Sequence, residues 1–408
     1  MNSTILLHDL IKQATLSLEE KRYSPGAIAH CQATWRLLES ECLKKGSPLH
    51  DPGLCLSIVK KHYKIPKLGK ASPNQTSRLR HLKMLEEISA GNSIGRCSKS
   101  KAALEPGNFV PVLDPYEAYT LGKGLSQKTA QGKRTTIARF MNYLQSMGVT
   151  DLAMSAPSCV LGFMEELSSS KLSSQTRSLS LFTLRDFLVF CERESIAEEK
   201  CSGLLGTIQT KKNERVPSLY PVADRRKLLS LVDRSTAGGK REYAILLLAI
   251  QLGIRAGDIR HLKTSDIHWS RGTLEFTQQK TGNPIALPLP ENVKFALLDY
   301  LKNARPETGA DAVFIRSRAP FEPYGGNNSF LYIVEKYMGK AGVDYSNRKH
   351  GLHSVRHSLA ATLLKGNTPY TVISGILGHE DTSTTTQACL PIDIAQLKEA
   401  ALGVQNGE

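Results

Sequence analysis

Two short segments of this 408-residue chain carry a β-strand pattern, and the other patterned stretches are helical. Thr273–Thr277 and Ile285–Leu289 are rich in apolar and β-branched residues, and the turn-forming run Gln-Gln-Lys-Thr-Gly-Asn-Pro lies between them. This pair predicts one antiparallel hairpin. Because apolar residues recur at helical spacing on both sides of it, we expect a multidomain, mainly α protein whose last domain is α+β with a small antiparallel sheet.

Stretches rich in proline, glycine and polar residues divide the chain. The predicted parts are an accessory helical domain at 1–105, a second helical domain at 107–205, an extended linker at 206–221 and an α+β domain at 222–408. In the last domain we expect helices at Arg226–Arg234, Glu242–Leu252, Asn292–Lys302, Phe330–Gly339, Ser354–Lys365, Tyr370–Leu377 and, as a C-terminal tail, Ile392–Leu402.

The two helical parts share a weak internal similarity. Ser24 and Ser126 have the features of helix N-caps, and the helix-ending glycines Gly46 and Gly148 follow them at the same interval. This similarity predicts two related small helical domains. A further helix around 174–194 has an apolar face made of Leu179, Leu181, Leu184, Phe187, Leu188 and Phe190.

The chain is strongly basic, with a formal net charge of +15 at pH 7. Residues 1–106 hold 17 Lys/Arg against 9 Asp/Glu, and 60–83 contain basic residues but no acidic one. Such a run can neutralise several nucleic-acid phosphates; a solvated surface beside a loop is the alternative. The residues predicted to contact double-stranded DNA are Lys60, Lys61, Lys64, Lys67, Arg78, Arg80, Lys133, Arg134, Lys211, Lys212 and Arg215.

Targeting and redox features are sparse. No stretch approaches the roughly 20 apolar residues that span a bilayer, and the N-terminus lacks the basic start and long apolar centre of a signal peptide. None of the eight cysteines forms a CxxC pair, which predicts reduced thiols. We therefore expect a cytoplasmic protein, associated with the nucleoid.

Basic and imidazole side chains recur in short local contexts near the C-terminus. Arg255 follows a buried apolar helix, and Lys280 lies in the predicted hairpin turn. His353 and Arg356 stand three residues apart on one face of a helix start, and His379 ends the motif Leu-Gly-His. Taken singly, each has an ordinary explanation as a capping, ion-paired or solvated residue.

In this order, with a strand pair in the middle, the set resembles the catalytic signature of the tyrosine recombinases, or phage integrases. The resemblance runs from Pro217 to the end of the chain. The helical domain before it resembles that family's core-binding domain, and the N-terminal domain resembles more loosely the accessory DNA-binding domains of some integrases. It implies site-specific recombination for integration, excision or transposition of a phage or mobile element. It also implies a homotetramer on two DNA duplexes, and no metal or cofactor.

By resemblance, the catalytic residues are Arg255, Lys280, His353, Arg356 and His379, supported by Asp258. The reaction passes through a highly negative pentacoordinate phosphorus, whose oxygens two arginines can bind with paired N–H donors. The histidines would add hydrogen bonds or shuttle a proton. The lysine, on a mobile hairpin, would protonate the leaving 5′ oxygen. The aspartate would orient an arginine or a histidine.

The nucleophile departs from the family pattern. The family places a tyrosine shortly after the Leu-Gly-His motif, following threonines, whereas this chain has Cys389 at that position. The last tyrosine, Tyr370, precedes the motif, and we interpret it as a packing residue. Three alternatives follow: a recombinase disarmed at its nucleophile, a regulatory relative that binds without cutting, or a cysteine nucleophile. A thiol is nucleophilic once ionised, but it reaches less far than a phenol.

Other hypotheses explain part of the pattern. A type IB topoisomerase uses similar chemistry but fits the helical domain and motif spacing less well. A non-enzymatic DNA-binding or architectural protein is distinguished at Cys389, because covalent DNA adducts after its replacement with tyrosine would show that the rest of the site is competent. A basic protein with chance motif matches is a third hypothesis. The tail at 392–404 could pack against a neighbouring protomer or close its own domain.

Overall fold

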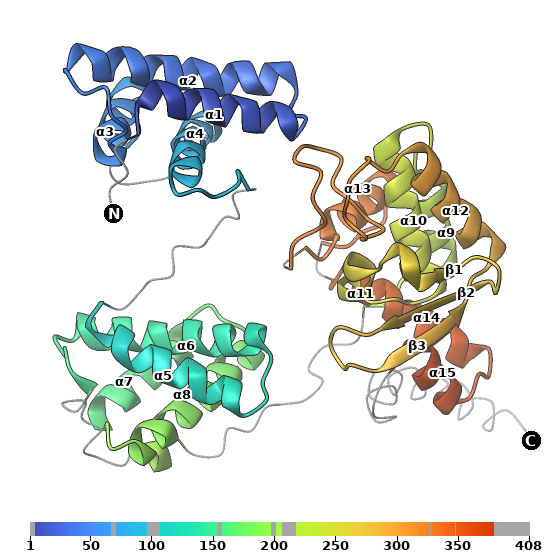
Figure 1. The fold of residues 1–408 in the computed structure, drawn as a ribbon. Coiled ribbons are helices and arrows are strands. Elements are labelled where there is room, and N and C mark those ends of the chain that lie inside the picture. The colour runs from blue at the N-terminus through green and yellow to red at the C-terminus, as the bar shows by residue number, and fades with distance from the viewer. Residues whose placement is uncertain are drawn as a thin grey trace, which may run out of the picture. The chain divides into compact units, whose positions relative to one another are not determined.

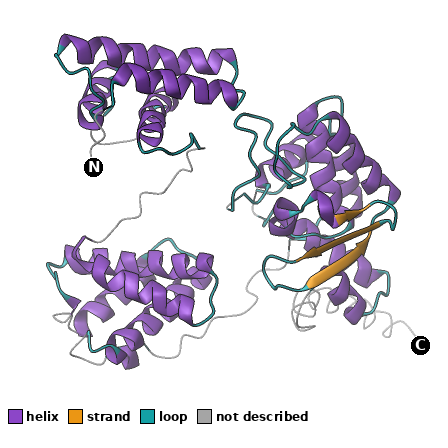
Figure 2. Cartoon of the chain, viewed as in Figure 1, coloured by secondary structure: helices purple, strands orange, loops and turns teal. Residues whose placement is uncertain are grey.

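The computed structural model describes residues 5–66, 71–95, 107–152, 157–196, 201–205, 218–326, 328–346 and 348–378. The chain divides into two compact units, one made of 1–96 together with 215–408 and the other of 97–214. Helices dominate the described residues, and the few strands form a single sheet (Figures 1 and 2). The predicted fold class is confirmed.

The N-terminal part of the first unit is a helical cluster with its own hydrophobic core. Its helices are α1 (Leu7–Glu20), α2 (Pro25–Lys44), α3 (Pro52–His62) and α4 (Pro73–Ser89). Ser24 and Ser72 cap α2 and α4 with their side chains, and each precedes a proline in the first turn. Trp35 is fully buried in the core. The helix predicted between Ser24 and Gly46 is confirmed.

The second unit is also helical. Its elements are α5 (Val110–Gly122), α6 (Gln127–Ser146), α7 (Pro157–Ser169) and α8 (Ser174–Arg193), with short 3₁₀ turns at Gly107–Phe109 and Ser202–Leu204. The predicted cap of α6 is confirmed, because Ser126 accepts the backbone N–H of Thr129. The predicted apolar face of α8 is wrong at one residue, which is exposed to solvent. Leu179 is 66% exposed, since it is rotated away from Leu184 and Phe187 at the centre of the buried face.

The C-terminal part of the first unit contains the sheet. Strands β1 (Ile267–His268), β2 (Thr273–Thr277) and β3 (Pro284–Pro288) pair antiparallel in the order β1-β2-β3. The predicted hairpin is confirmed, with its second strand beginning one residue earlier than expected. The helices are α9 (Val222–Ser230), α10 (Ala237–Gln251), α11 (Ala256–His261), α12 (Glu291–Asn303), α13 (Leu331–Ala341), α14 (Leu352–Lys365) and α15 (Tyr370–Leu377).

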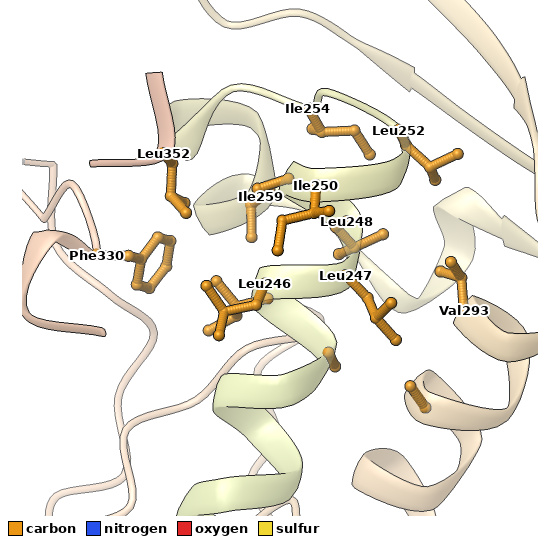
Figure 3. Packing of buried hydrophobic residues seen from close by; sticks show 14 of the residues in the cluster. Leu246, Leu247, Leu248, Ile250, Leu252, Ile254, Ile259, Val293, Phe330 and Leu352 are labelled. Carbon is orange, nitrogen blue, oxygen red and sulfur yellow. The ribbon is translucent and has the colours of Figure 1, made fainter. Parts of the chain in front are cut away.

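Helix α10 forms the centre of this core. Its residues from Ala244 to Ile250 are all buried, as expected for a helix that is apolar all round. Side chains from α12, α14 and the segment before α13 surround it, including Val293, Leu352 and Phe330 (Figure 3). The rigid core fixes the turn after α10, which carries Arg255.

Two predicted helices have the wrong bounds. The helix expected at Glu242–Leu252 is α10, which already begins at Ala237. We expected Arg226–Arg234, whereas α9 spans Val222–Ser230. The chain turns instead at Asp233, whose carboxylate accepts the backbone N–H of Ser235 at 2.9 Å and its hydroxyl at 2.6 Å. The predicted tail helix lies outside the described residues. Among the helices that are described, none is long and apolar enough to cross a membrane.

Candidate active site

The turn between α10 and α11 places the first arginine. Gly253 has a φ of +63°, and a Cβ at this position would lie 2.8 Å from Cδ2 of Leu377. Glycine therefore permits both the backbone conformation and the close approach of α15. Arg255, at the N-cap of α11, donates from Nη2 to the carbonyl oxygen of Gly378 at 3.3 Å. Its Nη1 is buried and has no hydrogen-bond partner among the described residues.

The second arginine lies in the first turns of α14. Arg356 is only 3% exposed and donates from Nη1 to the carbonyl oxygen of Gly253 at 2.6 Å. Its Nη2 donates to the carbonyl oxygen of Leu377. Burial, and then the nearby charge of Arg255, lower the pKa of Arg356 to about 9, while Asp258 opposes the shift. The guanidinium is still protonated at neutral pH, and the two arginines converge on the carboxyl end of α15.

Asp258 connects this turn to the hairpin. The carboxylate is buried, and Oδ1 accepts the backbone N–H of Gln279 at 2.9 Å. Its Oδ2 has no partner among the described residues. The negative charge raises the pKa of Arg255, although desolvation dominates and the net shift is downward. The hydrogen bond of Asp258 thus goes to the hairpin backbone, whereas we expected it to orient an arginine or a histidine.

Lys280 follows Gln279 in the turn between β2 and β3, and its side chain is exposed. Asp258 accepts the backbone N–H of the residue just before Lys280. The backbone next to Lys280 is therefore fixed by a hydrogen bond, whereas the Lys280 side chain that carries the ammonium group is flexible.

A histidine pair flanks the arginines. Nε2 of His353 lies 2.9 Å from Nε2 of His357, and the ring centroids are 4.3 Å apart. The pKa of His353 is lowered to about 4, first by desolvation and then by the positive charges of His357, Arg356, Arg255 and Lys280. The side chain of His353 is exposed, so water still reaches part of the ring. The protein atoms around the rest of the ring disfavour its charged form. The imidazole is neutral at pH 7.

The structure thus brings Arg255, His353 and Arg356 together, with Lys280 close enough to influence the charge of His353. Among the described residues, the two arginines do not each have a carboxylate that neutralises them. A buried N–H such as Nη1 of Arg255 normally has a hydrogen-bond acceptor, so this arrangement is suited to binding an anion. His379 and Cys389 lie outside the described residues. No cluster of three or more potential metal-binding His, Cys, Asp or Glu residues occurs in the described segments.

The residues predicted to bind DNA fall into two groups. Lys60, Lys61 and Lys64 are exposed. The other four described residues already have partners. Arg80 pairs with Glu87, Arg78 donates to the His30 carbonyl and the Thr34 hydroxyl, Lys133 pairs with Asp186, and Arg134 pairs with Asp114 and Glu117. Lys67, Lys211, Lys212 and Arg215 lie outside the described residues.

Sequence reasoning missed Gln278 and His357. Gln278 is 3% exposed, and its Nε2 donates to the carbonyl oxygen of Leu377 at 3.2 Å. A polar residue beside a turn is ordinarily solvated, so nothing in the pattern indicated this long-range contact. His357 could have been found, since it stands four residues after His353 on the same helix face.

The comparisons with known proteins agree with this geometry. The sequence model of the phage integrase family matches residues 222–388, and that of the integrase N-terminal SAM-like domain matches residues 113–195. A Sinorhizobium fredii protein named "Putative integrase/recombinase y4gC" is 35% identical over 158 residues, which cover 39% of this chain and 80% of that protein. The chain belongs to the phage integrase family. The predicted membership is confirmed.

Two further family members extend the likeness along the chain. The S. fredii protein y4rA, named in the same way, is 27% identical over 338 residues, covering 83% of this chain and 79% of that protein. Tyrosine recombinase XerC of Oceanobacillus iheyensis is 27% identical over 283 residues, covering 67% of this chain and 89% of that protein.

Solved structures of the family share the fold. XerH site-specific recombinase, bound to palindromic difH substrate in a post-cleavage complex, has a TM-score of 0.56 and 18% identity, covering 84% of this chain and 92% of that one. A lambda integrase dimer bound to a COC' core site has a TM-score of 0.53 and 20% identity, covering 68% of this chain and 93% of that one.

Proposed function

We propose that this chain is a site-specific DNA recombinase that breaks and rejoins strands through a covalent 3′-phosphoprotein link. The observation that carries the proposal is the convergence of Arg255 and Arg356 on the end of α15, with a buried N–H of Arg255 unpaired among the described residues. Two guanidinium groups held in place by backbone carbonyls are suited to one phosphate whose negative charge increases during the reaction.

In the proposed cleavage, a nucleophile attacks the scissile phosphorus and forms the new bond as the bond to O5′ breaks. Arg255 and Arg356 bind the non-bridging oxygens, and Lys280 transfers a proton to the departing O5′. His353 is neutral at pH 7, so it can donate one hydrogen bond to a non-bridging oxygen without adding charge. Rejoining reverses these steps, with the 5′-hydroxyl of the partner strand as nucleophile. We assign to His379 the uptake of the proton that the attacking nucleophile loses.

The proposed partner is double-stranded DNA at specific sites. The XerH and lambda integrase structures contain DNA sites of those proteins, and we extend this property to the present chain. Exposed Lys60, Lys61 and Lys64 provide positive charge for phosphates. We further propose the three domains predicted from the sequence, a homotetramer on two duplexes, and a role in integration, excision or transposition of a phage or other mobile element, in the cytoplasm at the nucleoid.

We also propose that strand cleavage by this chain is impaired. The family attacks with a tyrosine, whereas Cys389 occupies that sequence position. A thiol is shorter than a phenol, so an unchanged backbone would hold the sulfur away from the phosphorus. Retention of Arg255, Lys280, His353, Arg356 and His379 favours a recombinase lacking only its nucleophile over a regulatory relative that never cut.

The test compares the full chain with Cys389→Tyr and Cys389→Phe. A binding site is first selected from random duplexes with the full chain, then rebuilt as nicked suicide substrates in which the departing 5′ fragment is too short to stay bound. Denaturing gels report any covalent protein–DNA adduct. The phenylalanine variant fills similar space without a hydroxyl.

An adduct with Cys389→Tyr alone supports a recombinase disarmed at its nucleophile. An adduct with the unaltered chain would show that Cys389 is itself the nucleophile and would refute the proposed impairment. Tight, selective binding without an adduct from any variant would replace the proposal with a regulatory protein that binds DNA without cutting it.

A further inference from the structure

A buried amide joins the turn that carries Lys280 to the end of α15. Gln278 directly follows β2 and is only 3% exposed, although it stands in a polar turn. Its Nε2 donates to the carbonyl oxygen of Leu377, the last residue of α15, at 3.2 Å. The two segments lie side by side at the edge of the domain (Figure 1). Through this side-chain hydrogen bond, the hairpin is linked to α15.

The hairpin itself fixes the orientation of this amide. Thr281 donates its hydroxyl to Oε1 of Gln278 at 2.8 Å. The backbone of Gln278 also closes the turn, accepting from the N–H of Gly282 and donating to the carbonyl of Asn283, both at 2.9 Å. Together with the bond from the Gln279 N–H to Asp258, these contacts hold the residues on both sides of Lys280.

On the helix side, one carbonyl serves two donors. The oxygen of Leu377 accepts from Nε2 of Gln278 and from Nη2 of Arg356, which its two lone pairs allow. The packing is close. A Cβ on Gly378 would lie 2.2 Å from Cδ1 of Ile285 and 2.5 Å from Nε2 of Gln278, so a side chain at 378 would force the hairpin and helix apart.

We propose that Gln278 is a positioning residue that fixes the hairpin of Lys280 relative to Arg356 through the shared Leu377 carbonyl. The inference rests on the proposed function. When the bond from phosphorus to O5′ breaks, the Lys280 proton must reach O5′ while Arg356 holds the non-bridging oxygens. A lysine has a flexible four-carbon stem, so a fixed turn limits the volume its ammonium explores and favours transfer.

The decisive comparison is Gln278→Met against Gln279→Met, both in the Cys389→Tyr background. The two changes are chemically the same, but the Gln279 side chain is exposed. Single-turnover cleavage is measured on an ordinary duplex and on one with sulfur in place of the bridging O5′. A thiolate is a good leaving group without a proton, so the sulfur substrate bypasses Lys280.

For Gln278→Met we expect ordinary cleavage to slow by about 10- to 100-fold, which is part of the roughly 10²–10⁴-fold that a general acid usually contributes. Cleavage of the sulfur substrate should stay within about threefold of its parent. Gln279→Met should change neither. Thr281→Val, which removes only the bond that orients the amide, should give a smaller loss with the same rescue. Equal losses on both substrates, or no loss at all, would refute the positioning role.

A second measurement does not depend on cleavage. In the full chain without DNA, Gln278→Met should speed amide hydrogen exchange at Gln279 and Gly282 relative to Gln279→Met. Unchanged exchange at the hairpin would refute the tether. If Cys389→Tyr cleaves neither substrate, the proposed catalytic function fails, and the exchange result alone then decides whether Gln278 fixes the turn.

Discussion

Two groups of basic side chains in this molecule differ in how firmly they are held. Arg255 and Arg356 donate to backbone carbonyls at the end of α15. In the N-terminal region, Lys60, Lys61 and Lys64 are exposed and make no side-chain hydrogen bond to described residues. Fixed donors can select one phosphate geometry, whereas mobile ammonium groups attract any polyanion at a distance set by salt. Charge alone therefore does not reveal which residues perform chemistry.

The N-terminal basic run contains the same contrast on a smaller scale. Arg80 donates from Nη1 and Nη2 to the two carboxylate oxygens of Glu87, at 2.8 and 3.0 Å. Arg78 packs over the ring of Tyr63 and donates to Thr34. These two arginines hold helices in place. Under the proposed function, the exposed lysines of the run are therefore the described residues that we expect to bind DNA phosphates. The more firmly a basic side chain is held, the larger the effect expected from replacing it.

The largest effect is expected from Arg356→Lys in the Cys389→Tyr background. Lysine keeps the charge but loses the planar fork that reaches both Gly253 and Leu377. Single-turnover adduct formation at saturating DNA should fall by about 10²–10³-fold, as when one preorganised donor is removed. Arg318→Lys, an exposed residue of the same domain, serves as the matched control and should cleave like its parent.

The salt dependence of DNA binding should be unchanged in Arg356→Lys, because the net charge is conserved. A variant that cleaves normally would mean that positive charge near the phosphate suffices and that fixed geometry adds nothing. The contrast between the two groups of basic residues would then disappear.

The second effect separates the lysines from Arg80. Replacing Lys60, Lys61 and Lys64 together with glutamine should lower the slope of log affinity against log salt by about 2.7, at roughly 0.9 for each phosphate that is no longer neutralised. Filter binding at several salt concentrations measures it. Arg80→Gln should leave the slope unchanged but destabilise the N-terminal helices by about 1–3 kcal/mol, since Glu87 would lose its partner.

Amide hydrogen exchange in α4 reports the stability change. If Arg80→Gln instead lowers the salt slope while exchange in α4 is unaltered, Arg80 leaves Glu87 to bind DNA. The division of the basic run into structural arginines and DNA-contacting lysines would then be wrong.

Local sequence patterns predicted those helices and strands that are determined by residues close together in the chain. The β-branched residues of Thr273–Thr277 and the turn after them gave the hairpin, and apolar spacing gave α15 with the observed ends. The order Arg, Lys, HxxR, LGH indicated the site, and three of its members meet in the structure. Helix α9 was misplaced because Asp233 can either continue a helix or turn back on Ser235.

Contacts between distant segments could not be predicted in this way. The bond from Gln278 to Leu377 joins residues 99 positions apart, and no periodicity links a turn to the end of a later helix. Lys133 was expected to meet DNA, but it pairs with Asp186, which α8 brings to it. Tertiary packing decides whether a basic side chain pairs with an acidic residue of the same protein or stays available to a ligand.

The smallest expected effect is a change in the pKa of His353. It tests how strongly the charges of Arg255 and Arg356 act on a neighbouring side chain. NMR titration of the full chain should give His353 a pKa of about 4, because desolvation and then His357, Arg356, Arg255 and Lys280 disfavour the charged ring. The folded pKa lies below the ordinary value near 6.5. Its contribution to stability is therefore complete above pH 6.5 and is lost as the pH falls toward 4.

His357→Ala should raise the pKa of His353, since His357 is the second cause of the shift and the two Nε2 atoms, 2.9 Å apart, cannot both carry a proton. His261→Ala, an exposed histidine of α11, should leave it unchanged. A bound phosphate should raise it further by offsetting Arg255 and Arg356. If phosphate leaves the pKa of His353 in place while His357→Ala moves it, desolvation and the paired imidazole keep His353 neutral without a contribution from the two arginines.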